Sequence, residues 1–178
     1  MRASNRAGYS FMPKIDLKWI SSELKSQRQS GAEGVLAMVG EVEPKQPLIF
    51  AEIASLARDG ASDHELAGVV SYLTLMQRAA ASINVGTTVS PDEYRESVNR
   101  AYDWFTTLQN DGAEGMASRI AGWVADVALD GEPGIWVACL ELIKTHRLLE
   151  ADLAGPLIIT MHAIADVFSR RIDALDRH

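Results

Sequence analysis

Apolar residues recur three and four positions apart along most of this 178-residue chain, and this spacing constrains the fold more than any other feature. A period of 3.6 residues places such side chains on one face of an α-helix, whereas a half-buried strand would alternate every second residue. Glycine and proline divide the pattern into segments of helical length. The sequence therefore predicts an all-α fold, a compact bundle of about eight amphipathic helices.

The expected helices follow one another with short breaks. They cover residues 14–29, 32–43, 47–60, 62 to the loop at 84–90, 90–110, 113–129, 135–146 and 151–175. The last of them carries the widest apolar stripe, from Leu157 to Leu175, and we expect it to be the central, most buried helix. Near its start, Gly155-Pro156 should either delay the first turn or kink it.

Three helix starts are marked most clearly. Pro47 is a residue that a first turn tolerates, and Ser62 with Glu65 has the S-x-x-E spacing of a capping box. The segment Ser90-Pro91-Asp92-Glu93 combines an N-cap serine, a proline at the first helical position and a capping glutamate. Because capping explains these acidic residues, they are not evidence for a cation site.

Length and composition fit one folded domain. Hydrophobic residues make up 47% of the chain and charged residues 23%, as in globular proteins. We expect residues 1–12 to form a flexible N-terminal extension and residues 13–178 to form a single all-helical domain. The first residues include arginines but no apolar stretch behind them, and no run of about 18 apolar residues occurs anywhere. A soluble protein of the cytoplasm, with no membrane segment, is therefore expected.

The formal net charge is −7, so phosphate backbones would be repelled and nucleic acid is not an expected partner. An acidic surface instead suits binding to a partner protein or to a second copy of the chain. We expect the contact at the acidic loop of Asp126, Asp130 and Glu132, with Trp136 as an aromatic anchor. Helix termination at Gly131 explains the same loop without a partner, and both interpretations stay open.

No motif for catalysis, metal binding or nucleotide binding occurs in the chain. The nucleophile pattern G-x-S-x-G and both glycine-rich phosphate patterns are absent, and no histidine has the H-E-x-x-H or E-x-x-H spacing of a metal ligand. The single cysteine, Cys139, lies in an apolar run, where a buried small side chain is expected rather than a reactive thiol. The sequence therefore predicts no catalytic residue and no metal site, and an enzyme is not expected.

A cofactor-binding or small-molecule-binding protein is the alternative, with haem or another apolar ligand held between helices. The order of the last two helices is similar to that of a globin, a shape that many all-α proteins of this size share. His162 and His146 are the side chains that would serve as axial ligands. Asp166 lies one turn after His162 and can orient its ring. A hydrogen-bonded core histidine is the simpler interpretation of that pair.

Two related four-helix halves are a further alternative for the bundle. The tetrapeptide GAEG occurs at 31–34 and at 112–115, and ELAG at 65–68 is matched by DLAG at 152–155. Alanine-rich amphipathic helices also match one another through periodicity alone, so a common origin of the halves stays open. On elimination, the sequence predicts a non-enzymatic protein-interaction module, such as an adaptor, chaperone, assembly subunit or inhibitor-like protein, with an acidic helical surface.

Overall fold

The computed structural model describes residues 15–109 and 133–177, and within them the chain forms seven α-helices, two short 3-10 helices and no strand. The all-α prediction is confirmed, and the helix expected at 113–129 lies outside the described residues. The elements are α1 (Leu17–Gln29), α2 (Gly31–Val42), α3 (Pro47–Arg58), α4 (Asp63–Ser82), α5 (Pro91–Gln109), α7 (Pro133–Thr145), η1 (Leu148–Glu150), α8 (Ala154–Asp173) and η2 (Ala174–Arg177).

The helix starts expected from the sequence are confirmed. Before α4, the carboxylate of Glu65 accepts from the amide of Ser62 at 2.7 Å, and the Ser62 hydroxyl accepts from the amide of Glu65 at 3.4 Å. Ser90 and Glu93 form the same reciprocal pair before α5, at 2.9 and 3.3 Å. Pro47 is the first residue of α3. These starts satisfy amide groups that a helix leaves without an internal partner.

The start of the last long helix differs from the expected position. The residues before it form η1, and α8 begins at Ala154 rather than at residue 151. Gly155 and Pro156 therefore fall in the first turn, where the missing N–H of proline breaks no helical hydrogen bond. The Gly155-Pro156 pair thus lies at the start of α8 and not in its interior.

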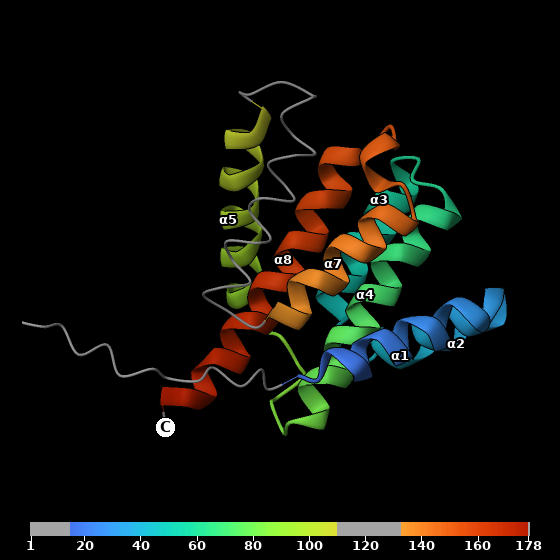
Figure 1. The fold of residues 1–178 in the computed structure, drawn as a ribbon. Helices are drawn as coiled ribbons and strands as arrows, with labels where there is room; N and C mark the ends of the chain where they lie inside the picture. Colours follow the sequence, from blue (N-terminus) through green and yellow to red (C-terminus); the bar gives the residue numbers. More distant parts are fainter. Residues whose placement is uncertain (1–14, 110–132, 178) are drawn as a thin grey trace, which may run out of the picture.

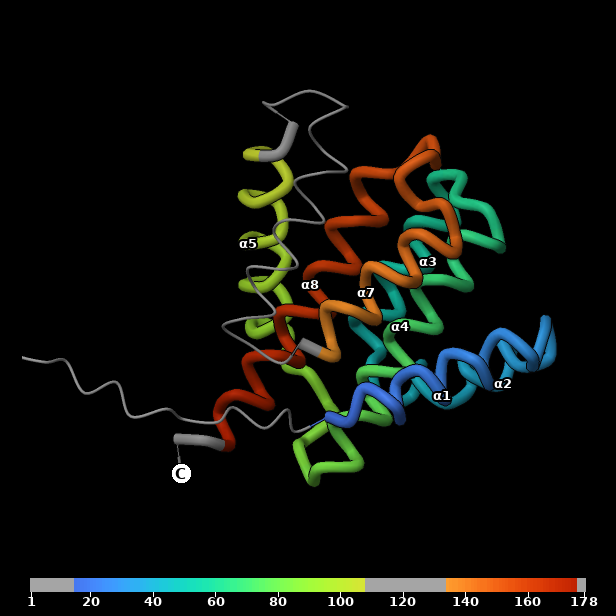
Figure 2. The backbone as a smooth tube through the Cα atoms, viewed as in Figure 1, coloured from blue at the N-terminus to red at the C-terminus, as the bar shows by residue number. Residues whose placement is uncertain are grey.

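Two helices of 20 residues, α4 and α8, form the centre of the molecule (Figure 1). α8 packs against α4, α5 and α7, with α5 on one side of it and α7 and α4 on the other. α1 and α2 lie side by side and both pack against α4, as the backbone trace shows (Figure 2). Burial of α8 was expected, and α4 shares its central position. Buried residues from Ile15 to Ile172 belong to one hydrophobic cluster.

Arginine side chains connect the helices around this core. Arg78 on α4 pairs with Glu41 on α2 and with Glu23 on α1. Arg171 on α8 lies 2.8 Å from Glu93 on α5. These ion pairs fix the outer helices to the central pair.

The pairs α3–α4 and α7–α8 have similar lengths, with 12 and 20 residues in the first pair and 13 and 20 in the second. The second copy of GAEG, at 112–115, lies outside the described residues, so the two-half organisation stays a prediction. None of the described helices combines the length and the apolar character needed to cross a membrane.

Candidate functional site

The apolar face of α2 is only partly covered by the rest of the chain. The periodicity places Val35, Leu36, Val39 and Val42 together on a core face. Val42 is completely buried, but Val35 and Val39 are only half-buried and Leu36 is 72% exposed. The expectation of a core position is therefore wrong for Leu36. The remaining apolar surface of α2 borders a groove instead of a helix.

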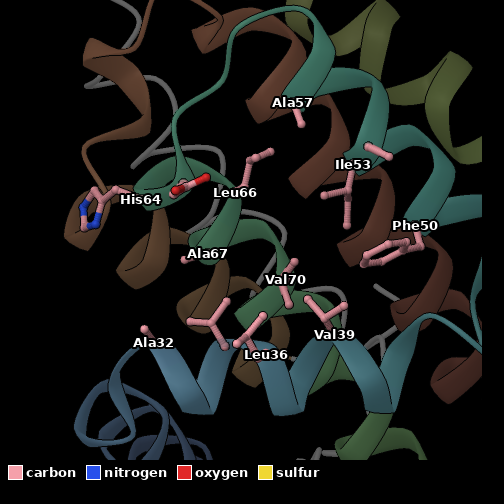
Figure 3. Close-up of a pocket in the computed structure, with 13 residues that line it drawn as sticks. Ala32, Leu36, Val39, Phe50, Ile53, Ala57, His64, Leu66, Ala67 and Val70 are labelled. Atoms are coloured by element: carbon pink, nitrogen blue, oxygen red, sulfur yellow. The ribbon is translucent and has the colours of Figure 1, made fainter.

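This groove, which we call the apolar groove, lies between α2, α3 and α4 and has a volume of about 670 Å³ (Figure 3). Eleven of its thirteen lining residues are alanine or larger apolar residues, and the other two are Asp63 and His64 at the start of α4. The apolar residues are Ala32, Val35, Leu36 and Val39 of α2, Phe50, Ile53, Ala54 and Ala57 of α3, and Leu66, Ala67 and Val70 of α4. One side of the groove is open to solvent.

A second cavity, which we call the polar pocket, adjoins the apolar groove. It has a volume of about 290 Å³ and lies between α1, α2, α4 and the end of α7. Val35, His64 and Ala67 line both cavities, so the two cavities share a wall. The polar pocket differs from the groove because polar side chains contribute much of its wall. These side chains are Gln27, Arg28, His64, Ser71, Thr145 and His146.

Hydrogen bonds fix two of these polar side chains. One guanidinium nitrogen of Arg28 donates to Oε1 of Glu141 and to Oγ1 of Thr145, both at 2.8 Å. Nδ1 of His146 lies 2.7 Å from the backbone oxygen of His64, and because a carbonyl only accepts, Nδ1 carries the proton. Burial lowers the pKa of His146, more than the bond to His64 raises it. The ring is therefore neutral at neutral pH, and its Nε2 is an acceptor.

The two histidines considered as axial ligands lie in different places. His146 lies just beyond the C-terminal end of α7 and lines the polar pocket. His162 on α8 is 7% exposed and packs near the other end of α7, with its ring centroid 4.6 Å from Trp104 and 5.4 Å from Trp136. Two indole rings therefore contact this imidazole, and the role of His162 and His146 as axial ligands stays a prediction. Burial lowers the pKa of His162 to about 4.

The acidic loop expected to contact a partner falls mainly on residues that the structure does not describe. Asp126, Asp130 and Glu132 lie in that segment, and their role stays a prediction. Trp136 is described, and it is only 3% exposed and packs against His162. In this chain it therefore belongs to the core.

The expected burial of Cys139 is confirmed. Its side chain is buried, and burial raises the pKa of the thiol to about 12. A thiol with such a pKa has almost no thiolate at neutral pH, so it is a poor nucleophile. Among the described residues, no three His, Cys, Asp or Glu side chains gather closely enough to hold a metal ion.

Sequence reasoning missed both cavities. Val35, Leu36 and Val39 were expected in the core, because periodicity identifies an apolar face but not what covers it. The polar pocket has no motif at all, since its walls come from four helices. The small residues Gly31 and Ala32 of α2 were the available signal, because they offer little side chain with which to fill a gap between helices.

Comparison with known protein families, with curated proteins and with solved structures finds no significant match for this chain.

Proposed function

We propose that this chain is a non-enzymatic, cytoplasmic protein-interaction module that binds an amphipathic helix of a partner protein in the apolar groove. The observation that carries the proposal is the groove itself, with Leu36 left 72% exposed on α2. Recognition of a helix by an apolar groove is a recurrent mode of protein binding, in which apolar residues at positions i, i+3 or i+4, and i+7 enter the groove. Roles as an adaptor, a chaperone, an assembly subunit or an inhibitor all use such a site.

The shape of the groove favours a helix over a small apolar molecule. Small-molecule sites bury roughly 70–90% of the ligand surface, whereas this groove is open along one side. An amphipathic helix matches an open groove because its polar face stays in water while its apolar face is buried. It would also cover the exposed part of Leu36, which a ligand lying inside the groove would leave in water.

The net charge of the chain indicates which charges the polar face of the partner helix carries. With a net charge of −7, the protein attracts a basic helix over long distances and repels an acidic one. The partner helix is therefore proposed to carry lysine or arginine on its polar side. The acidic loop of Asp126, Asp130 and Glu132 contributes three of the negative charges in this total.

A small amphiphile is the second candidate for the same site. The volume of about 670 Å³ lies within the range of roughly 300–1,000 Å³ that is usual for ligand pockets. The adjoining polar pocket offers a place for a polar head group. This candidate differs from the haem alternative because it uses the two cavities rather than His162.

Site-specific photo-crosslinking in the cells that make the protein distinguishes these candidates. A benzophenone amino acid replaces Leu36 in one full-length variant and Tyr102, 61% exposed on α5, in the control. We expect a protein adduct from position 36 that position 102 does not give. Ala57→Arg should abolish the adduct, because it adds bulk and positive charge to the groove, while Ala51→Arg, on an exposed site of α3 outside the groove, should leave it unchanged.

Each result of the crosslinking distinguishes between possible occupants of the apolar groove: a partner helix, a second copy of the chain or a small amphiphile. An adduct with a second copy of the chain would replace the partner helix by a homo-oligomer. A lipid-like adduct, or an amphiphile released by organic extraction of the purified protein, would support the small-molecule candidate instead. Equal labelling from positions 36 and 102, or labelling that Ala57→Arg does not change, would remove the groove as the binding site.

A further inference from the structure

The surface of α2 beside the apolar groove carries only negative charge. None of the residues of this helix, Gly31–Val42, is a lysine or an arginine. Glu33 lies three positions before Leu36, and Glu43, the C-cap of the helix, lies seven positions after it. Both therefore share the side of α2 on which Leu36 is exposed. The two carboxylates are about three helical turns, or roughly 15 Å, apart along the helix.

These two carboxylates differ from the third one on α2. Glu41 pairs with Arg78 on α4, so its charge is compensated within the chain. Glu33 and Glu43 are exposed, and neither forms an ion pair within the part of the chain that the structure describes. Their charges are therefore available to a molecule that covers Leu36.

The α3 wall of the groove carries a positive charge instead. Arg58 is the last residue of α3 and lies four positions after Ala54, which lines the groove. Its side chain is exposed and makes no ion pair with the described residues. The third helix of the groove, α4, adds the carboxylate of Asp63 in its first turn. A helix lying in the groove therefore meets carboxylates along α2 and at the start of α4, and a guanidinium on α3.

We propose that the partner helix carries its lysine or arginine residues on the flank that faces α2, where they pair with Glu33 and Glu43, and neutral or acidic residues on the flank that faces Arg58. This inference rests on the proposed function. With its apolar face kept in the groove, a helix exchanges its two flanks only when its direction is reversed. The charges beside the groove therefore set the direction in which the partner helix lies.

The test uses two synthetic amphipathic helices of about 20 residues, each with leucine at positions i, i+3, i+4 and i+7. The first has lysine on one flank of the leucine stripe and an equal number of glutamates on the other, and the second has the same composition with the flanks exchanged. A nitroxide spin label at the N-terminus of each peptide broadens nearby methyl NMR signals of the full-length, isotope-labelled protein. Ala32 and Val39, the first and last groove residues of α2, report the direction (Figure 3).

We expect the two peptides to bind in opposite directions, so that one broadens Ala32 more than Val39 and the other does the reverse. The lysines and glutamates of each peptide balance, so long-range attraction to the net charge of the protein does not decide the direction. The direction that sets lysine against α2 should be preferred about tenfold at low ionic strength, because reversal replaces each attraction by a repulsion. High salt should reduce this preference, since exposed charges are screened.

Charge reversal on α2 and on the far side of α3 provides matched variants. Glu33→Lys/Glu43→Lys makes both flanks of the groove basic and should remove the preferred direction. Glu52→Lys/Asp59→Lys changes the net charge by the same amount, at exposed residues that lie two positions after groove residues of α3 and therefore on the other side of that helix. This control should leave the direction of each peptide as in the wild type.

The contrary results separate the inference from the proposed function. One common direction for both peptides, or loss of the preference in the α3 control as well, would overturn the inference and leave the groove as a helix site. This comparison of peptides uses the wild-type chain, so it holds even if a variant does not fold. No broadening of Ala32 or Val39 by either peptide at about millimolar concentration would overturn the inference, while crosslinking at Leu36 tests the proposed function on its own.

Discussion

The imidazole of His162 lies against the indole of Trp104, with the ring centroids 4.6 Å apart and the planes inclined by 35°. His162 is 7% exposed, and this burial lowers the pKa of the ring to about 4, although the nearby carboxylate of Asp166 acts in the opposite direction. The core of this protein therefore contains a neutral histidine that the fold holds against protonation.

Acid should destabilise the protein through this histidine. Unfolded histidine has a pKa near 6.5 and the folded His162 about 4, so between these values the unfolded chain binds more protons. The free energy of unfolding should fall as the pH drops through this window, by on the order of 3 kcal/mol. Urea unfolding of the wild type and of His162→Phe at several pH values measures the effect. A wild-type slope no steeper than that of the variant would contradict it.

A second prediction concerns the ion pairs that Asp166 on α8 makes with Arg100 on α5 and with Arg170 one turn further along α8. The carboxylate of Asp166 is 17% exposed and lies 2.7 Å from Arg100 and 3.2 Å from Arg170. Burial tends to raise the pKa of Asp166, but hydrogen bonds from Arg100 and Ser97 outweigh it and lower the pKa. Asp166→Asn should cost about 2–3 kcal/mol of stability in urea unfolding, because Arg100 and Arg170 lose their more buried carboxylate partner and keep only the exposed Glu96.

The control for Asp166→Asn breaks an exposed ion pair. Arg95 and Asp92 lie 3.1 Å apart on the surface of α5, with side chains 70% and 92% exposed. Exposed pairs contribute little to stability, so Arg95→Gln should change the urea midpoint much less. Equal effects of the two substitutions would mean that burial of Asp166 does not matter.

The third prediction uses two helical glycines that differ in their surroundings. A Cβ added to Gly68 would lie 2.8 Å from Cγ of His146, whereas one added to Gly40 would meet nothing within 4 Å. Alanine in a helix is favoured over glycine by roughly 0.5–1 kcal/mol, so Gly40→Ala should stabilise the protein by that amount. Gly68→Ala should destabilise it by about 1–2 kcal/mol, because the ring must move.

Thermal or urea unfolding measures the stability of Gly40→Ala and Gly68→Ala. The double variant Gly68→Ala/His146→Ala tests whether the contact with the His146 ring causes the loss of stability. Removal of the imidazole should recover stability relative to Gly68→Ala alone, since the clash is gone. If Gly68→Ala stabilises the protein as Gly40→Ala does, the close approach of His146 to α4 is not maintained in solution.

These relationships separate what the sequence could predict from what it could not. The capping of α4 by Ser62 and of α5 by Ser90 depends on residues within four positions, and the sequence predicted both correctly. The approach of His146 to Gly68 joins residues on α4 and beyond α7, and no local pattern contains it. Local chemistry could be predicted, whereas packing between distant helices could not.

The candidate site depends entirely on packing between helices that are distant in the sequence, so it could not be predicted. Gln27 is an ordinary helix residue in the sequence, and only the packing of α1 against its neighbours makes it buried. Leu36 follows the apolar period of its helix but lies beyond the reach of α3 and α4. Periodicity predicts which side of a helix is apolar, and the three-dimensional arrangement decides whether that side becomes core or surface.

The last prediction tests, on α2 alone, which apolar residues belong to the core and which to the surface. Leu36 and Met38 lie two positions apart on α2, and the two residues are 72% and 4% exposed. Leu36→Gln should change the free energy of unfolding by no more than about 0.5 kcal/mol, as an exposed substitution does. Met38→Gln should cost at least about 2 kcal/mol, because it buries an amide in an apolar environment. Urea unfolding measures both, and a comparable loss from Leu36→Gln would mean that the apolar groove is closed in solution and that α2 contributes its whole apolar face to the core.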